Sequence, residues 1–390
     1  MKIILTPATS ELQVTDHIRI PAQALNQNGS TTLDFSLHGG LTITDVQGAR
    51  ITAQKNVESS NSGHVPLKHY TLTLASQQTE LTVHYQGKIN HAVQNPGEEY
   101  ARSFSYTPGV ISNDGVFLAN SSRWYPQFDD ALVSFQLTIE VPSDWNVVSQ
   151  GTLVNEQKIA TNQTVVWEET QPQDDIYIVA GRYHRYTQST GAVNALVYLR
   201  SADDALAQKY LDTTAQYIGM YNKLLGPYPY TKFALVENFW ETGYGMPSFT
   251  LLGPKVIRFP FILHSSYPHE ILHNYWGNGV FVDYAKGNWA EGLTAYLADH
   301  LVNEQRGKGE EYRRDVLQKY ADFVSKEKDF PLIRFVSRHS ASSEAIGYGK
   351  TMMFFHMLRQ ELGDETFVKA LRQLYKQFKF RQATFDDVQV

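Results

Sequence analysis

The chain has 390 residues, enough for two domains and a large buried core. Hydrophobic residues make up 42% and charged residues 19%, as in a globular protein, and the formal net charge of −6 argues against nucleic acid as a partner, because phosphate binding needs a basic face. Cysteine is absent, which excludes disulfides, a cysteine nucleophile and thiolate metal sites.

Residues 1–187 are predicted to form an all-β domain. Apolar and polar residues alternate over 133–141, and the segments 69–75 and 80–86 show the same period of two. Clusters of turn-forming residues, for example at 26–30 and 95–98, separate such segments. The polar stretch 187–194 predicts the end of this domain.

Residues 188–390 are predicted to form a mixed, then helical, domain. A short strand at 195–200 precedes a helix over 203–224, with Ser201 as its cap and Gly226-Pro227 as its end. Glycines interrupt strand-like sequence over 228–253. Further helices are predicted near 267–276, 289–305, 309–326, 348–362 and 364–378. A β domain followed by a mixed and helical domain is an α+β fold.

The two ends of the chain also carry expectations. The start, MKIILTPATSELQV, has too short an apolar run for a signal peptide and leads into a predicted strand, which favours an export signal already removed and a periplasmic or secreted location. The last residues, ATFDDVQV, are typical of a cap and first helical turn, which predicts a catalytic domain incomplete at its C-terminus. No run of about 18 apolar residues occurs, so no membrane span is predicted. The oligomeric state cannot be read from the sequence.

The stretch PHEILHNYW at 268–276 is the first candidate for chemistry. On a helix, His269 and His273 lie on one face about one turn apart, so both imidazoles can reach one cation. Glu270 lies about 100° round the helix, which suits a base acting on a metal-bound water. A histidine pair on a helix is more often structural than metal-binding, so a third ligand is required.

Glu291 supplies that third candidate. It begins an otherwise apolar helical run in GNWAEGLTAYLADHL. A carboxylate among apolar side chains costs several kcal/mol unless a positive charge meets it, and a cation on His269 and His273 would supply that charge. The alternative is a solvated acid at a helix start. The pattern predicts one Zn²⁺ per chain on His269, His273 and Glu291, with a water in the fourth position.

These residues carry a resemblance to a known family. PHEILHNYWGN followed by NWAEGLTAYL resembles the gluzincin zinc metallopeptidases of the aminopeptidase N and leukotriene hydrolase family. The resemblance implies the same three ligands and makes Glu270 the general base. The sequence departs from the family pattern at three points: the spacing to Glu291 is one residue short, Ala290 replaces a usual Asn, and Ala298 stands where an acid is common. Asp299 lies one position further along, and whether it replaces that acid is open at this point.

Two further stretches extend the resemblance. AIGYGKTMMFFHMLRQELG is similar to the family's helix start whose tyrosine stabilises the oxyanion, which implies that role for Tyr348; the alternative is a tyrosine that packs a helix N-terminus. SSRWYPQFDDALVSFQLTIEVP resembles a segment of the family's first domain. The implied architecture is a saddle-like β domain followed by a thermolysin-like catalytic domain.

The stretch ETGYGMPSFTLL resembles the family's substrate-binding strand. Gly243, Tyr244, Gly245 and Met246 fall on that strand, but Gly245 stands where the family has the glutamate that binds the substrate's free amino group. Two nearby acids, Glu237 and Glu241, are candidates to replace it, and solvated strand-end acids are the alternative. The glycines suit a strand edge where a peptide backbone pairs.

The expected function is that of a zinc-dependent metallopeptidase that hydrolyses peptides with a zinc-activated water, Glu270 as base and Tyr348 as oxyanion donor. Aminopeptidase-like action is the first expectation. The alternatives are an endopeptidase using the same site, a non-peptidase hydrolase, and an inactive peptide-binding scaffold.

Overall fold

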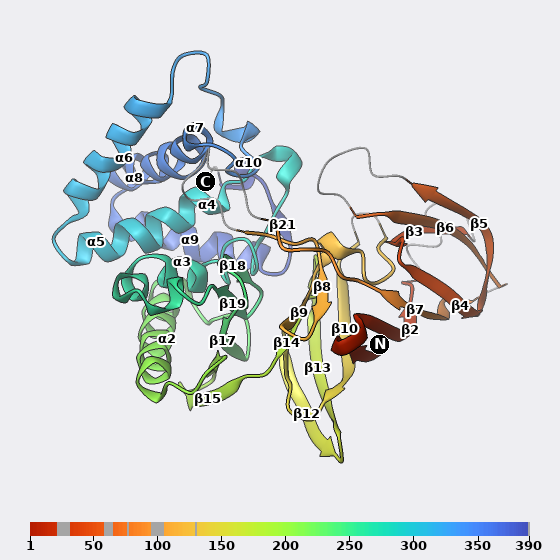
Figure 1. Cartoon of the computed structure of the whole chain (residues 1–390). Helices are drawn as coiled ribbons and strands as arrows, with labels where there is room; N and C mark the ends of the chain where they lie inside the picture. Colours follow the sequence, from red (N-terminus) through yellow and green to blue (C-terminus); the bar gives the residue numbers. More distant parts are fainter. Residues whose placement is uncertain (22–31, 58–64, 76–77, 95–104, 129–130, 389–390) are drawn as a thin grey trace. The chain divides into compact units, whose positions relative to one another are not determined.

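The computed structural model describes residues 1–21, 32–57, 65–75, 78–94, 105–128 and 131–388, in two compact units that divide after Tyr183 (Figure 1). The turn clusters predicted at 26–30 and 95–98 lie outside these residues. The predicted domain boundary at 187/188 falls inside strand β15 (His184–Ser189), because the polar stretch forms a hairpin with β16 (Asn194–Leu199) instead of a linker. The predicted α+β class is confirmed.

The N-terminal unit is built from β-sheets. A seven-stranded sheet has the order β12-β13-β10-β1-β2-β7-β4, and smaller sheets have the orders β11-β14-β9-β8 and β3-β6-β5. The strands are β1 Lys2–Thr6, β2 Glu11–Arg19, β3 Thr32–His38, β4 Leu41–Gln47, β5 Ala49–Val57, β6 Leu67–Leu74, β7 Glu80–Lys88, β8 Val110–Ser112, β9 Gly115–Leu118, β10 Val133–Pro142, β11 Asn146–Val148, β12 Thr152–Ile159, β13 Asn162–Gln173 and β14 Ile178–Gly181.

The period of two in the sequence sets this unit's core. In β10, Leu137, Ile139 and Val141 are buried while the residues between them are not. Trp124, Trp145 and Trp167 are also almost wholly buried in the same apolar cluster. The strands predicted over 69–75, 80–86 and 133–141 correspond to β6, β7 and β10, so these three predictions are confirmed.

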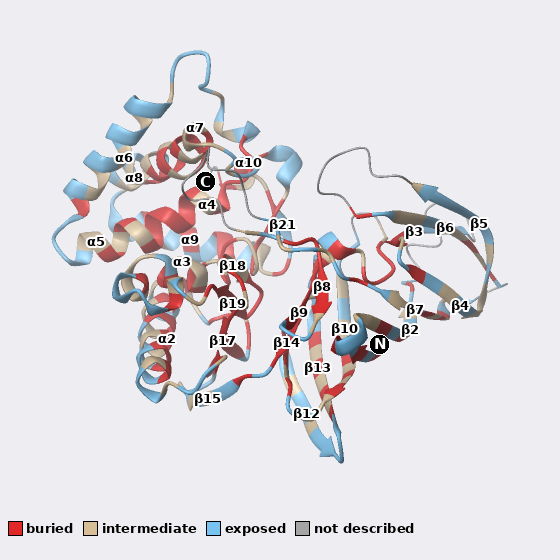
Figure 2. Cartoon of the chain, viewed as in Figure 1, coloured by how far each residue is buried: buried red, intermediate tan, exposed pale blue. Residues whose placement is uncertain are grey.

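The C-terminal unit begins with a mixed five-stranded sheet of order β15-β16-β17-β19-β18. Its inner strands β16, β17 (Lys232–Glu237) and β19 (Phe249–Leu252) run parallel to one another, and the edge strands β15 and β18 (Gly243–Met246) are antiparallel to their neighbours. Every residue of β17 and β19 is buried (Figure 2), as expected for strands inside a sheet.

Helices make up most of the remaining chain. The helix α2 (Asp204–Leu225) packs against β16, and its cap is Asp203 rather than the predicted Ser201: the Asp203 carboxylate accepts the Leu206 N–H at 2.9 Å. The other helices are α3 Ser266–Leu272, α4 Ala290–Thr294, α5 Leu301–Gln305, α6 Gly309–Phe323, α7 Ala341–Glu344, α8 Thr351–Leu362, α9 Asp364–Phe378 and α10 Phe385–Val388, and a short parallel pair joins β20 (Phe281–Val282) to β21 (Gln382–Ala383).

Two helices contain wider turns that the sequence pattern does not indicate. Between α4 and α5, residues Ala295–His300 (η6) are π-helical, and before α8 the same is true of Ala345–Lys350 (η8). A π turn inserts one residue and rotates everything that follows it. Both insertions lie beside residues predicted to act in the site.

Within the part of the chain that the structure describes, no helix combines the length and the apolarity needed to cross a membrane.

Candidate active site

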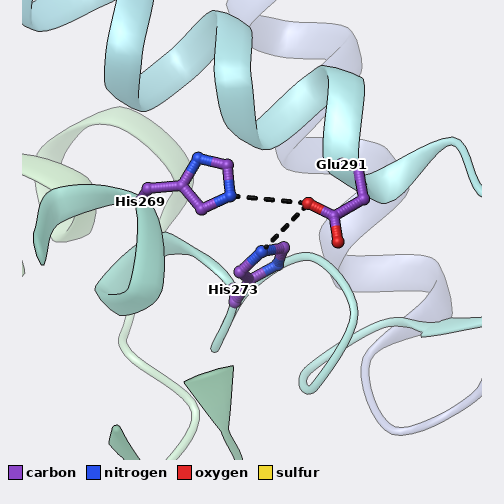
Figure 3. Close-up of side chains that lie close together, drawn as sticks. All are labelled: His269, His273 and Glu291. Atoms are coloured by element: carbon purple, nitrogen blue, oxygen red, sulfur yellow. Dashed lines mark ion pairs between the residues drawn. The ribbon is translucent and has the colours of Figure 1, made fainter. Parts of the chain in front are cut away.

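The helices α3 and α4 bring the three predicted metal ligands together. His269 and His273 point toward the carboxylate of Glu291 (Figure 3). Glu291 Oε2 lies 3.4 Å from His269 Nε2 and 3.3 Å from His273 Nε2, and one ligand atom from each residue falls within 4.8 Å of the others. Two imidazoles and one carboxylate are a donor set typical of catalytic zinc.

The outer nitrogens of both histidines are already engaged. His269 Nδ1–H donates to Asp299 Oδ2 at 2.9 Å, and His273 Nδ1–H donates to the Trp276 carbonyl at 3.0 Å. These bonds leave both Nε2 atoms directed at Glu291, where each imidazole in its neutral form would offer a lone pair to a metal.

Glu291 Oε2 is the strongest sign that a cation fits here. Among the described residues it is a buried oxygen with no hydrogen-bond partner. Burial by itself raises the pKa of Glu291, but His273 and His269 outweigh it and hold the pKa well below its ordinary value. Burial likewise disfavours charge on His269, yet Asp299 and Glu291 raise the pKa of that imidazole well above its usual range. The pocket therefore favours a positive charge beside Glu291, and the residues present fit zinc.

Asn288 fixes the start of the helix that carries Glu291. Its side-chain oxygen accepts the N–H groups of Ala290 and Glu291 at 3.2 and 3.4 Å. Its own N–H donates to the Phe335 carbonyl at 2.6 Å, and its side-chain nitrogen donates to the Val336 carbonyl at 3.0 Å. Glu291 is thus held by a cap that also anchors a distant segment of the chain.

The π turn explains why the acid behind His269 is Asp299 and not residue 298. In a regular helix about seven residues make two turns, so residue 298 would lie over Glu291. The segment η6 inserts one residue between them, which moves residue 299 to that face and buries Ala298 in the core. The question left open by the sequence is resolved, because Asp299 takes the place of the missing acid.

Glu270 lies in the pocket beside strand β18. Burial raises its pKa, while the two histidines oppose that rise. A Cβ atom at Gly245 would overlap Glu270 Oε2 and would lie 3.4 Å from His273 Cδ2. A side chain at residue 245 would therefore displace the end of the flexible Glu270 side chain from its present place against the strand.

Among the strands that the structure describes, β18 lies at the edge of its sheet. The N–H of Gly253 donates to the Thr242 carbonyl, so in the antiparallel ladder Tyr244 and Met246 also pair toward β19. Alternation then turns the N–H and C=O groups of Gly243 and Gly245 outward. The predicted substrate strand thus has outward-facing backbone groups next to Glu270 at Gly243 and Gly245. Met246, in contrast, has a buried side chain, and its backbone pairs with β19, so it does not contribute to this edge.

Asn274 ties this strand to the metal helix. Its side-chain oxygen accepts the Ser248 N–H at 2.6 Å, and its nitrogen donates to the Glu270 and Ile271 carbonyls at 3.2 and 3.1 Å. Ser248 has a φ of 66°, a left-handed conformation that these bonds help to hold. The distance between the β18 edge and Glu270 is set by this contact.

Tyr348 lies in the π segment η8, beside the metal ligands. Its ring is nearly parallel to that of His269, with 6.2 Å between ring centres, and the Phe335 ring meets it edge-on at 6.0 Å. Burial raises the pKa of Tyr348 well above its ordinary value, and the nearby Glu291 charge adds to the rise. The phenol therefore keeps its proton and can donate it in a hydrogen bond.

The two acids considered as replacements for the amine-binding glutamate differ in their contacts. Glu237 is buried, pairs with Arg258 Nη1 at 2.6 Å and accepts the Arg200 N–H at 2.8 Å. Glu241 Oε1 accepts the Lys255 N–H at 3.0 Å, while its Oε2 is buried near Gly253 and has no hydrogen-bond partner among the described residues. Glu237 is therefore fully engaged, and one oxygen of Glu241 is not.

Together, the helix pair, its His-His-Glu cluster and the adjoining strand edge define a site of the zinc-metallopeptidase class. Comparison with known proteins agrees: residues 264–389 match the peptidase family M1 domain. The predicted resemblance to this group of zinc peptidases is confirmed.

The relatives are aminopeptidases. The chain is 23% identical over 292 residues to the mitochondrial aminopeptidase 2 of Saccharomyces cerevisiae, covering 69% of this chain and 31% of the relative. It is 19% identical over 402 residues to the alanine/arginine aminopeptidase of the same yeast, covering 97% and 46%. The chain thus spans less than half the length of these two relatives.

Solved structures share the fold. An M1 zinc metallopeptidase mutant from Deinococcus radiodurans, bound to a Tyr-Ser-Ala substrate, superposes with a TM-score of 0.70 at 15% identity, covering 99% of this chain and 87% of that one. Leukotriene A4 hydrolase from S. cerevisiae gives a TM-score of 0.69 at 16% identity, covering 100% and 63%.

Sequence analysis did not single out Asn274 and Asn288. Each is a polar side chain with at most 5% exposure. Each asparagine hydrogen-bonds to a segment distant in sequence. A local sequence pattern does not reveal such bonds. An asparagine directly after the second histidine, and another before the acidic helix, were the available hints.

Removing the metal-site carboxylate should remove the metal. We expect elemental analysis to find one zinc per chain in the wild type. In the Glu291→Gln variant the zinc affinity should fall by more than the ~10–100-fold that is typical of losing a hydrogen bond to a ligand. The matched control is Glu270→Gln, an isosteric change in the same pocket at a residue that is not a ligand, which should keep its zinc. Equal zinc retention in both variants would contradict the ligand assignment.

Asp299 should matter for metal affinity although it does not belong to the ligand set. The Asp299→Ala variant loses the acceptor of the His269 Nδ1–H, so its zinc dissociation constant should rise about 10–100-fold in competition with a chelator. The Asp364→Ala variant removes an exposed acid that pairs with Arg359 and should leave the zinc affinity unchanged. An unchanged affinity in Asp299→Ala would show that Asp299 only packs.

Proposed function

We propose that this chain is a zinc-dependent metallopeptidase whose action on peptides is aminopeptidase-like. The observation that supports this proposal most is the buried, unpartnered Glu291 oxygen facing two histidine nitrogens, with Glu270 beside the same pair. The match of residues 264–389 and the aminopeptidase relatives add independent support.

Three residues would hold the metal, namely His269, His273 and Glu291. When bound there, zinc acts as a Lewis acid that acidifies water and polarises a carbonyl group. Glu270, held beside the histidines and against Gly245, takes the proton from the attacking water and returns it to the leaving amine. Tyr348, which keeps its phenolic proton, donates it in a hydrogen bond to the oxyanion that develops on the scissile carbonyl.

The substrate backbone would pair with the edge of β18. The outward N–H and C=O groups of Gly243 and Gly245 offer donors and acceptors to an extended peptide. The peptide bond that reaches Glu270 is then the one opposite Gly245, since these two residues are in contact. Clamping of the Ser248 turn by Asn274 keeps this alignment fixed.

The position of Gly245 favours a second candidate, an endopeptidase using the same site. Residue 245 carries no acid, Glu237 pairs with Arg258, and one oxygen of Glu241 accepts the Lys255 N–H. Desolvating an ammonium group without an acidic partner costs several kcal/mol, so a free N-terminus should bring little advantage.

The expected periplasmic or secreted location stays a prediction.

The zinc-loaded chain should hydrolyse peptides from a mixed library, and two variants separate the catalytic roles. Glu270→Gln should retain zinc but lose activity by about 100-fold or more, because the general base is lost. Tyr348→Phe should lower kcat by about 100-fold with KM nearly unchanged, because its hydrogen bond acts in the transition state. Activity that survives Glu270→Gln would contradict the peptidase mechanism, and an unaltered kcat in Tyr348→Phe would mean that this tyrosine only packs.

One peptide assayed in free and N-acetylated forms tests the preference for N-termini. The aminopeptidase-like proposal predicts that N-acetylation blocks cleavage; the endopeptidase candidate predicts that kcat/KM differs by less than about tenfold between the two forms, because no carboxylate at residue 245 receives the ammonium group. Similar rates would favour the endopeptidase, and blocked cleavage of the acetylated form would favour the aminopeptidase. A preference for the free form of about a hundredfold or more would refute the importance of the missing acid.

A further inference from the structure

Lys232 is a buried lysine at the start of β17, with only 3% of its surface exposed. Its ammonium group donates to Ser248 Oγ at 2.7 Å and to the Ser248 carbonyl at 3.2 Å. The same group lies 5.4 Å from the centre of the Phe249 ring, over the ring face. A lysine is rarely buried to this degree unless its charge is well bonded. The side chain of Lys232 is therefore committed to the turn at Ser248.

That turn has a conformation that serine seldom adopts. Pro247 and Ser248 join β18 to β19, and Met246 pairs with Phe249 across this two-residue connection. Proline followed by a residue with a φ of 66° is the arrangement of a type II turn, in which glycine is the usual second residue of the pair. A type II turn also twists against the strands of a hairpin. Bonds from outside the turn must therefore stabilise it.

Two side chains supply those bonds from opposite ends of Ser248. Asn274 accepts the Ser248 N–H at 2.6 Å, and Lys232 holds the side-chain and carbonyl oxygens. The Ser248 carbonyl also accepts the Ala234 N–H at 3.0 Å. The conformation of this one residue is thus fixed by β17 and by the segment that follows the metal helix.

The turn controls where the edge of β18 lies. Among the described strands β18 pairs with β19 alone, so its position depends on that ladder and on the turn that closes it. The outward backbone groups of Gly243 and Gly245, to which a substrate would pair, lie on this strand. A rotation at Ser248 would move them relative to Glu270, while the candidate zinc ligands stay on α3 and α4.

We propose that Lys232 is a positioning residue for substrate binding: by holding Ser248 in its left-handed conformation, it sets the place of the β18 edge to which the peptide backbone pairs. This inference rests on the proposed peptidase function.

The Lys232→Met variant keeps the length of the side chain and removes its charge and its hydrogen bonds. We expect its KM for peptides to rise about tenfold, with kcat changed by less than about threefold and the zinc content unchanged, because only the substrate edge is displaced. If this variant does not fold, Ser248→Ala, which removes only the Oγ acceptor, should raise KM in the same direction. An unchanged KM in the folded variant that is measured overturns the inference.

A core variant controls for a general loss of stability. Val197 is fully buried in β16, on the far side of β17 from β19, so Val197→Ala destabilises the same sheet away from the turn. It should lower the melting temperature and leave KM unchanged. A KM rise in Val197→Ala equal to that in Lys232→Met would reduce Lys232 to a packing residue and overturn the inference.

Glycine at residue 248 tests whether Lys232 acts through the turn. Glycine takes a φ of 66° without strain, so Ser248→Gly should have a KM close to that of the wild type. In the Lys232→Met/Ser248→Gly double variant, KM should return to within about threefold of the wild-type value. The same tenfold rise in both backgrounds would mean that Lys232 acts elsewhere, and would overturn the inference.

Hydrogen exchange separates this inference from the proposed function. In Lys232→Met the amides of Tyr244 and Met246, which pair toward β19, should exchange at least about tenfold faster relative to the amide of Val236 in β17. Unchanged relative exchange overturns the inference whatever the activity. Faster exchange in a protein whose wild type cleaves no peptide supports the hold of Lys232 on β18 and counts against the peptidase function instead.

Discussion

The candidate site in the C-terminal unit is built around one partly buried charge, the carboxylate of Glu291. Its Oε2 lies 3.4 and 3.3 Å from two histidine nitrogens and has no hydrogen-bond partner among the described residues. Positive charge at the two histidines stabilises this carboxylate, and a cation bound between the three side chains would supply that charge in their place. Asn288 caps the helix of Glu291, and the Nδ1–H groups of His269 and His273 are hydrogen-bonded to Asp299 and to the Trp276 carbonyl. These bonds hold the three candidate ligand atoms near one point.

Two π turns place the groups that assist the ligands. Each lies in a helix that the sequence predicts as regular, and each inserts a residue immediately beside the site. The first brings Asp299 behind His269, and the second carries Tyr348 to the face of the same imidazole. A π turn has weaker hydrogen bonding than a regular helix and occurs most often at functional sites. Two such turns beside one histidine therefore indicate that the positions of Asp299 and Tyr348 matter for function.

The pocket beside β18 combines steric and electrostatic constraints on the substrate. The end of the Glu270 side chain lies where a side chain at residue 245 would project, so the two positions compete for the same space. On the other side of the site, Arg338 lies over the ring face of Tyr348. Substrate preference and catalytic geometry are therefore linked through the placement of Glu270, and a change made for one will affect the other.

The sequence by itself indicated the α+β order of the fold, the helix near α3 and the three side chains, His269, His273 and Glu291, that the structure brings together. Period-two and helical patterns are local consequences of burial, and a His-Glu-x-x-His face needs only one helical turn to form. Tertiary structure decided the rest. Whether Asp299 or residue 298 contacts His269 depended on a π turn, and the contacts of Asn274 and Asn288 join segments far apart in the chain. Glu237 and Glu241 likewise read as free acids until their partners, Arg258 and the Lys255 amide, were placed beside them. Such partners are set by packing of the whole unit, which no local pattern encodes.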